Sequence, residues 1–268
     1  GQKMTVKKQS MEMVLEKIEG KYLMRDDKIT YELRKYNLSE ISQKFLFGIM
    51  YKISADFLKP FETNKNEQGQ TFIYKFSFDE LKEEINLDYR IESLKPKINK
   101  LLKELISTPI EISVFDENKK RKELINTNLI EKIVLSDMKD VLYISIDERL
   151  LPLYKATADK FTLWHFDYIV LSEKKYTPRL YEYLVEFAKS IGTKNIDNII
   201  SKTVDIDVLR YELSIPKSYK FDNIKKQILE PCKEELLGLT YENSEDYKLF
   251  KSFEYIENYE RKSTFASE

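Results

Sequence analysis

The sequence predicts an α+β fold made of two related halves, each with a helix-turn-helix followed by β-strands. Three observations support this prediction. One segment recurs about 130 residues later, a second amphipathic helix follows each copy, and stretches of alternating polar and apolar residues come after these helices. A chain of 268 residues is long enough for two domains with cores of their own.

The internal repeat aligns residues 76–87 with residues 204–215 at a constant offset of 128. The matching positions are Phe78/Ile206, Asp79/Asp207, Leu81/Leu209, Glu84/Glu212, Ile85/Leu213 and Leu87/Ile215. Each copy has an extended stretch, an aspartate near a helix start and a short helix. The following helices align at an offset of 130, so the second turn is two residues longer. This order indicates a duplicated helix-turn-helix, although two amphipathic helices can also match by chance.

Strand patterns after the two copies predict β-wings, so each half is interpreted as a winged-helix domain. After the first copy, strands are expected at residues 110–115, 129–135 and 141–146, with a polar tip at residues 116–123. After the second copy, residues 239–241 and 253–256 surround a polar turn at residues 243–246 and predict a shorter wing.

An opening helix is expected in each half. Residues 39–53 carry an apolar stripe, and Thr177 followed by Pro178 is a helix start signal, with Gly192 at the helix end. Residues 148–155 are interpreted as the connector. The predicted organisation is an N-terminal extension at residues 1–29, an N-terminal winged-helix domain at 30–148 and a C-terminal winged-helix domain at 149–268.

The composition excludes several kinds of chemistry. With 1 Cys and 1 His, the chain cannot form an internal disulfide, a zinc finger or the paired-histidine metal site of a relaxase. A Ser-His-Asp triad would need His165, which we interpret as a core residue. No two of the 6 glycines lie within five residues, so the nucleotide-binding motifs G-x-x-x-x-G-K and G-x-G-x-x-G are absent. We expect a non-enzymatic protein that uses no cofactor and no metal.

The distribution of apolar residues argues against a membrane protein. No apolar run reaches the roughly 18 residues that a membrane-spanning helix needs, and residues 1–12 lack the apolar core of a signal peptide. We therefore expect a soluble, cytoplasmic protein with no membrane partner.

The balance of 45 basic against 46 acidic residues hides strongly basic segments. Residues 94–103 contain four lysines and no acid, and residues 119–122 are four consecutive cations. From residue 172 to 226 there are 11 basic and 8 acidic residues, and from residue 230 onward the counts are 5 and 10. Local positive charge suits DNA phosphates, although a single outward lysine is equally consistent with a solvated helix face.

The second long helix has the pattern of a major-groove reading helix. Its predicted buried face contains Phe221, Ile224, Ile228 and Cys232, and we interpret the cysteine as a small apolar residue. Its opposite face presents Tyr219, Lys220, Asn223, Lys226 and Gln227. Lysine suits phosphates, and asparagine or glutamine can pair bidentately with adenine. Pro231 lacks an N–H and should kink the helix or restrict contacts to its N-terminal half.

Two stretches resemble a known family. Residues 172–184 match the pattern S-x-x-x-Y-[ST]-x-R-L-Y-E-x-L of the iteron-binding plasmid replication initiators, the Initiator Rep family. Residues 221–236 are similar to the family's helix pattern F-x-x-[FL]-K-[RK]-x-[VI]-L-x-x-A-x-x-E-[IL], with Cys232 at the usual alanine. The resemblance covers roughly residues 30–256, and the acidic C-terminal end departs from it.

This resemblance implies two winged-helix domains related by pseudo-symmetry, with the C-terminal long helix in the major groove of repeated double-stranded origin sites. Family members bind these iterons as monomers, open an adjacent AT-rich region and recruit host DnaA, helicase and primase. As homodimers formed through the N-terminal domain, they often repress their own promoter. Positions carried over as DNA contacts are Arg179, Lys220, Lys225 and Lys226, although Arg179 could instead pair with Glu182.

The predicted function is sequence-specific DNA binding by a plasmid replication initiator without a small-molecule substrate. A winged-helix transcriptional repressor without origin function is the alternative, and a protein scaffold is the fallback. The predicted DNA-binding residues are Lys97, Lys100, Lys119, Lys120, Arg121, Lys122, Lys174, Lys175, Arg179, Lys217, Tyr219, Lys220, Asn223, Lys225, Lys226 and Gln227.

Overall fold

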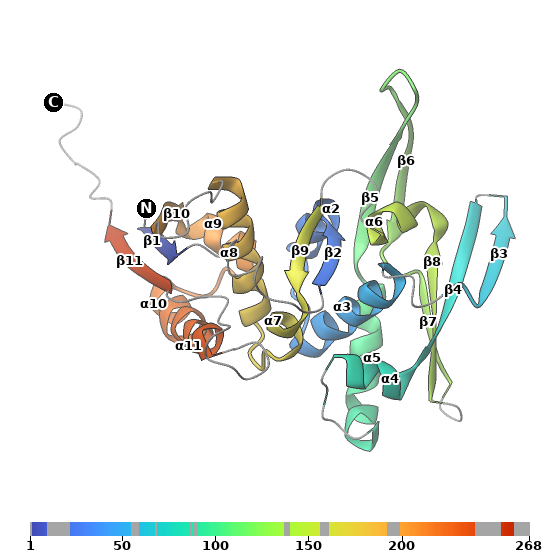
Figure 1. Cartoon of the computed structure of the whole chain (residues 1–268), viewed down its shortest axis with the longest axis horizontal. Helices are drawn as coiled ribbons and strands as arrows, with labels where there is room; N and C mark the ends of the chain where they lie inside the picture. Colours follow the sequence, from blue (N-terminus) through green and yellow to red (C-terminus); the bar gives the residue numbers. More distant parts are fainter. Residues whose placement is uncertain are drawn as a thin grey trace. The chain divides into compact units, whose positions relative to one another are not determined.

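The computed structural model describes residues 2–9, 22–54, 59–67, 69–85, 87, 91–136, 140–155, 161–191, 199–238 and 253–259 (Figure 1). Contacts divide the chain into an N-terminal unit, residues 22–171, and a C-terminal unit, residues 1–21 with 172–268. Each unit contains a helix-turn-helix and β-strands, which confirms the predicted α+β class. Within the described ranges, no helix is long and apolar enough to cross a membrane.

The division between the units differs from the predicted domain boundary after residue 148. The expected connector forms the short helices η1 (Glu148–Leu150) and α6 (Leu151–Tyr154). Leu150 and Leu153 are buried, and the Tyr154 hydroxyl donates to the Leu129 carbonyl at 2.8 Å. These contacts keep the segment inside the N-terminal unit, because separating it would expose buried apolar surface. The division therefore falls after Leu171.

Helices α3, α4 and α5 form the centre of the N-terminal unit. The helices of this unit outside the connector are α2 (Asp27–Leu33), α3 (Glu40–Ser54), α4 (Phe78–Glu84), α5 (Ile91–Ile106) and α7 (Phe166–Val170). The rings of Phe45 and Phe78 stack with centroids 5.7 Å apart. A Cβ on Gly48 would lie 2.5 Å from a methyl group of Ile85, so glycine permits the close approach of α3 and α4.

Two antiparallel sheets flank this helical core. The larger has the strand order β3 (Glu62–Asn66), β4 (Gly69–Ser77), β8 (Val141–Asp147) and β7 (Lys132–Ser136). Strand β2 (Tyr22–Asp26) pairs with β9 (Phe161–His165), so the predicted extension of residues 1–29 contributes a strand to this unit.

A hairpin of β5 (Pro109–Phe115) and β6 (Arg121–Asn128) projects from the unit in Figure 1 and forms the wing. Its second strand is not the predicted one, because the strand expected at residues 129–135 corresponds to β7 of the larger sheet. Its tip is shorter than the predicted residues 116–123, because β6 already begins at Arg121. The polar start of β6 resembled a loop in the sequence. Pairing with β5, in which Ile112 faces the buried Ile125, makes it a strand.

The C-terminal unit repeats the helical order. It contains α8 (Thr177–Ile191), α9 (Ile206–Leu213), α10 (Phe221–Ile224), the π-helical turn η2 (Lys225–Leu229) and α11 (Glu230–Gly238). Helix α8 begins at Thr177 as predicted, and the expected end at Gly192 lies outside the described residues. Asp205 and Ser77 cap the matching short helices α9 and α4 with their side chains.

The sheet of the C-terminal unit includes a strand from the beginning of the chain. Strand β1 (Gln2–Gln9) lies between β10 (Ile199–Asp205) and β11 (Phe253–Tyr259), antiparallel to both. The predicted strand at residues 253–256 is thus confirmed as part of β11. The other strand and the turn of the predicted C-terminal wing, residues 239–246, lie outside the described residues.

Candidate nucleic-acid interface

The reading helix of the C-terminal unit, residues 221–238, is positioned by a tight turn after α9. Ser214 adopts a left-handed conformation with φ of 56°, and the Ile215 N–H donates back to the Arg210 carbonyl at 2.8 Å. The Arg210 guanidinium also donates to the Tyr219 carbonyl at 3.1 Å. The arginine therefore holds the turn immediately before the reading helix, a role that the sequence analysis did not identify.

The reading helix has the predicted division into a buried and an exposed face. Phe221, Ile224, Ile228 and Cys232 are all at most 4% exposed. Burial raises the pKa of the Cys232 thiol to about 11, consistent with a packing role. The predicted contact residues on the exposed side are Lys217, Lys220, Asn223, Lys226 and Gln227, with Tyr219 and Lys225 partly exposed.

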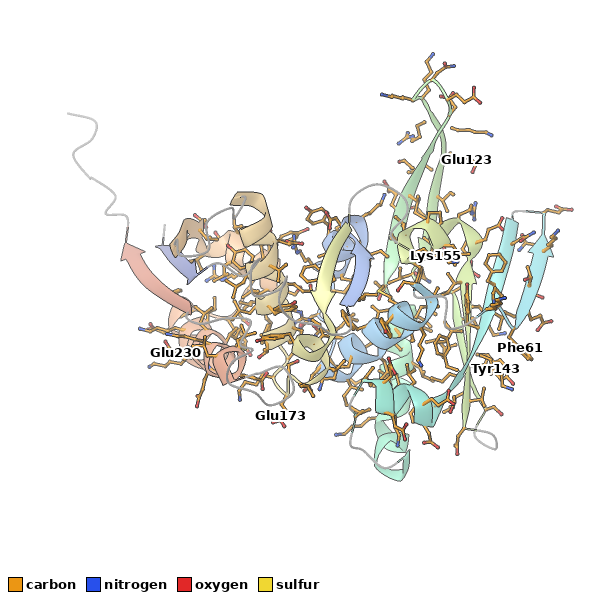
Figure 2. All side chains as sticks on the ribbon, viewed as in Figure 1. Phe61, Glu123, Tyr143, Lys155, Glu173 and Glu230 are labelled. Atoms are coloured by element: carbon orange, nitrogen blue, oxygen red, sulfur yellow. The ribbon has the colours of Figure 1, made fainter. Side chains whose placement is uncertain are left out.

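The exposed lysines of this helix and its N-terminal cap, Lys220 and Lys226, lie at its N-terminal end. Glu230 and Glu234 are exposed beyond it, and Figure 2 labels Glu230 on α11. Pro231 has no N–H and therefore cannot donate the usual helical hydrogen bond to the Gln227 carbonyl. The turn before it is π-helical, and in it the Glu230 N–H donates to the Lys225 carbonyl, five residues back. The predicted disturbance at Pro231 is therefore a widened turn.

The family-like stretch at residues 172–184 contributes mainly to packing. Leu180, Tyr181 and Leu184 are at most 1% exposed. Arg179 is 8% exposed, with its guanidinium carbon 5.4 Å from the centre of the Tyr176 ring. We therefore assign Arg179 to packing within the unit and not to the predicted phosphate contact, because little of its surface is left for DNA.

Two further predicted contacts lie just before α8. Lys174 is exposed, and the partly exposed Lys175 places its ammonium 5.7 Å from the centre of the Tyr176 ring. The Glu173 and Lys174 N–H groups donate to the carboxylate of Glu235 at 3.1 and 3.2 Å. This contact ties the segment carrying both lysines to the reading helix.

The basic hairpin of the N-terminal unit presents its four predicted cations at or next to the tip. Lys119, Lys120, Arg121 and Lys122 are all exposed. The carboxylate of Asp116 shapes the tip by accepting the N–H groups of Asn118 and Lys120, both at 2.9 Å. Asp116 is thus occupied within the turn, while Glu117 and Glu123 remain exposed beside the cations.

Helix α5 places Lys97 and Lys100 at the surface as predicted. In Figure 1 the hairpin tip and the lower part of α5 lie at opposite ends of the N-terminal unit. The four hairpin cations therefore form one group, and the α5 lysines form another.

Glu104 on α5 anchors the opening helix α3, a contact that was not predicted from the sequence. The Glu104 carboxylate accepts the Ser39 N–H at 3.1 Å, the Ser39 hydroxyl at 2.7 Å and the Ser42 hydroxyl. Burial alone would raise the pKa of Glu104, but the hydrogen bonds from the two serines outweigh it and hold that pKa below its ordinary value. Glu235 has the corresponding role in the C-terminal unit. The shared dipeptide Glu-Leu, at residues 104–105 and 235–236, is the sequence signal that could have revealed both contacts.

Comparison with known proteins agrees with this architecture. A family model for the initiator replication protein, WH1, matches residues 25–185, and one for the initiator Rep protein, WH2, matches residues 205–255. None of the curated proteins matches the chain. The fold is similar to the crystal structure of the Pi initiator protein in complex with iteron DNA, with a TM-score of 0.54, 16% identity, and coverage of 81% of this chain and 86% of that chain. The WH1 match alone covers more than half of the 268 residues, so the chain belongs to the initiator replication protein family, with a WH1 domain followed by a WH2 domain.

Proposed function

We propose that this protein initiates plasmid replication by binding repeated double-stranded sites, or iterons, at an origin. The observation that carries the proposal is the exposed face of the reading helix, where Lys220 and Lys226 accompany Asn223 and Gln227. This face combines groups for phosphates with groups for base edges. Family membership and the similarity to the Pi initiator, whose structure contains iteron DNA, support the same function.

Each part of the interface has a distinct task in this proposal. Lysines supply affinity by displacing counterions from the phosphates, and the two amides distinguish the iteron from other sequences. The basic hairpin adds phosphate contacts. Opening of the adjacent AT-rich DNA draws on bending and on the binding energy of several bound copies, since the sequence has no ATP-binding motif. The protein acts without catalysis, metal or cofactor.

The proposed working cycle includes other proteins. Monomers bind iterons and recruit host DnaA, helicase and primase in the bacterial cytoplasm. Homodimers formed through the N-terminal unit repress the protein's own promoter and so contribute to control of plasmid copy number. The family resemblance of residues 172–236 supports these partners.

Footprinting of the protein on its native plasmid tests the proposal. We expect protection of direct repeats that recur at whole helical turns of about 10.5 bp, with permanganate-reactive thymines in a neighbouring AT-rich tract. Protection of a single inverted repeat upstream of the protein's own gene, without reactive thymines, would instead establish a transcriptional repressor.

A further inference from the structure

An exposed aromatic patch lies on the four-stranded sheet of the N-terminal unit, apart from the basic hairpin tip and the α5 lysines. It consists of Phe61, Lys75 and Tyr143, and Figure 2 labels both rings. Phe61 is 58% exposed, and its ring lies 5.6 Å from that of Tyr143, centroid to centroid, at an interplanar angle of 53°. The Lys75 ammonium lies 5.4 Å from the centre of the Phe61 ring. Tyr143 is half-buried, so Phe61 is the exposed ring of the pair, and contiguous apolar surface of this kind marks a candidate binding surface.

The strand register places this patch on the outer face of the sheet. Tyr143 is the cross-strand partner of both Lys75 and Val134, and all three side chains therefore point to the same side. Val134 is 42% exposed. The alternate residues, including Tyr74 and Ile144, are buried on the inner face. The rings are thus presented by a sheet whose other side is fixed in the core.

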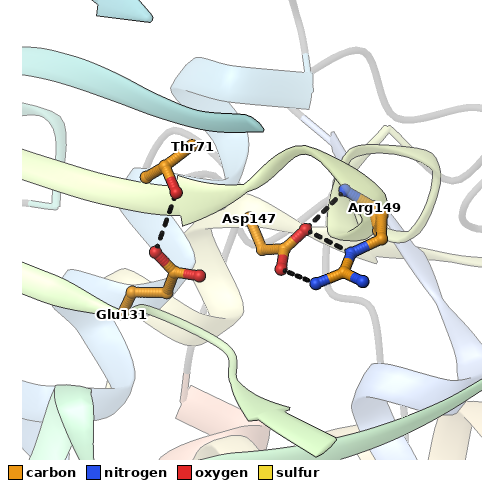
Figure 3. Close-up of polar contacts among 4 residues, drawn as sticks. All are labelled: Thr71, Glu131, Asp147 and Arg149. Atoms are coloured by element: carbon orange, nitrogen blue, oxygen red, sulfur yellow. Dashed lines mark hydrogen bonds and ion pairs between the residues drawn. The ribbon is translucent and has the colours of Figure 1, made fainter. Parts of the chain in front are cut away.

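The charges around the patch favour an anionic ligand. Lys132 belongs to the next row on the outer face, and Lys59 and Lys75 are exposed beside Phe61. Nearby acids are partly occupied: Asp147 pairs with Arg149 at 2.6 Å, and Glu131 accepts the Thr71 hydroxyl at 3.1 Å (Figure 3). Asp147 is neutralised by its partner, whereas Glu131 keeps its charge, so three exposed lysines stand against two exposed acids, Glu131 and Glu62.

We propose that Phe61 and Tyr143, with Lys75 beside them, form a binding site for single-stranded DNA. Every base has a ring face that can stack on an exposed aromatic side chain, while lysines contact the adjoining phosphates. A protein partner fits the patch less well, because lysine is depleted at the centres of protein interfaces and such interfaces need about 20–30 residues per side. The inference rests on the proposed function, because opening an origin creates the single strand that this sheet would hold.

Anisotropy titrations of the full-length protein test the site, with a fluorescein-labelled thymidine oligonucleotide of about 15 nucleotides as the probe. We expect Phe61→Ala to weaken binding of this probe about tenfold. Phe61→Leu should weaken it similarly, since leucine keeps apolar surface but has no ring, and Phe61→Trp should preserve binding. Glu62→Gln should strengthen binding by removing a nearby negative charge. Lys75→Ala should reduce the slope of log affinity against log salt by about 0.7.

A matched control is available on α2, where Tyr31 is 53% exposed and the Arg34 guanidinium lies 5.0 Å from the centre of its ring. Tyr31→Ala should leave binding of the thymidine probe unchanged. The footprinted duplex serves as the second probe, and its affinity should not respond to the Phe61 variants. This separates failure of the patch from failure of the proposed function.

Two outcomes would overturn the inference. One is unchanged affinity of Phe61→Ala for the thymidine probe. The other is a Phe61→Ala protein that changes from dimer to monomer in sedimentation while keeping that affinity, which would make the patch an interface between two copies of the chain.

Discussion

In each unit a short helix and a turn precede a long helix, and the two long helices differ by one inserted residue. Leu94 and Ile98 of α5 correspond to Ile224 and Ile228 at an offset of 130, whereas Leu101 and Leu105 correspond to Cys232 and Leu236 at an offset of 131. The change occurs at the π-helical turn, where the hydrogen bond spans one more residue. The extra residue therefore belongs to the C-terminal copy.

The two helices also carry their polar groups differently. The C-terminal helix combines exposed lysines with Asn223 and Gln227, while the N-terminal unit adds a basic hairpin remote from the exposed lysines of α5. We infer that the C-terminal unit supplies sequence recognition and the N-terminal unit supplies phosphate contacts. In the proposed function, one duplicated framework would support two modes of DNA contact.

The largest expected effect comes from reversing two charges on the C-terminal helix. Lys220→Glu with Lys226→Glu should weaken binding to the footprinted duplex about 100-fold or more, because two phosphate contacts become repulsive. The midpoint of thermal unfolding should barely change, since both side chains are exposed. Lys59→Glu with Lys65→Glu makes the same charge change on the N-terminal unit. If both pairs weaken duplex binding equally, the helix has no special role.

The basic hairpin should show a smaller loss with a distinct salt dependence. Alanine at Lys119, Lys120, Arg121 and Lys122 should weaken duplex binding about 30-fold and reduce the slope of log affinity against log salt by about 3. Titrations between low and physiological salt measure both quantities. Alanine at Glu117 and Glu123, on the same hairpin, should not reduce the slope. An unchanged slope in the fourfold variant would mean that the hairpin does not contact DNA.

The two amides should affect discrimination more than affinity. Asn223→Ala or Gln227→Ala should each reduce the preference for the footprinted site over a scrambled duplex by about tenfold, the value of one bidentate base contact. Competition titrations with both duplexes measure this ratio, and the salt slope should stay constant. Asn99→Ala, at an exposed amide of α5, is the matched change in the N-terminal unit and should leave the preference intact.

The smallest expected effect concerns the glutamate contacts that join the long helix to the opening helix. Glu104→Gln should lower the midpoint of thermal unfolding at pH 7 by about 3 °C, because the serines lose a charged acceptor. The folded state holds the pKa of Glu104 below its ordinary value, so the carboxylate stabilises the fold above its unfolded pKa. That stability is lost as the pH falls through the folded pKa, and the two proteins should therefore converge in acid. If the two proteins differ as much in unfolding midpoint at low pH as at pH 7, the charge of the Glu104 carboxylate is not the cause of the stability difference.

Local patterns predicted the helices and their exposed faces well. The start at Thr177, the buried face from Phe221 to Cys232 and the exposed hairpin cations all follow from spacing between near neighbours in the chain. The widened turn was predicted only as a disturbance at Pro231, since proline shows that a hydrogen bond is missing but not how the backbone responds.

Features that depend on distant partners were missed. Arg179 was expected at the surface, but the packing of the folded unit leaves it only 8% exposed. Residues 148–155 looked like a connector because the unit that buries Leu150 and Leu153 is formed by other parts of the chain. The pairing of β1 with β10 joins residues 190–202 positions apart, and its pairing with β11 joins residues 245–257 positions apart, so no local pattern specifies either pairing.

The placement of β1 has a consequence for the order of folding during synthesis. This strand is synthesised before the N-terminal unit, whereas its partners β10 and β11 follow that unit in the chain. The N-terminal unit can therefore fold while translation continues, but the C-terminal sheet cannot be completed until β11 has been made. Contacts between residues so distant in sequence form slowly. We expect the C-terminal unit to mature after the N-terminal unit has folded.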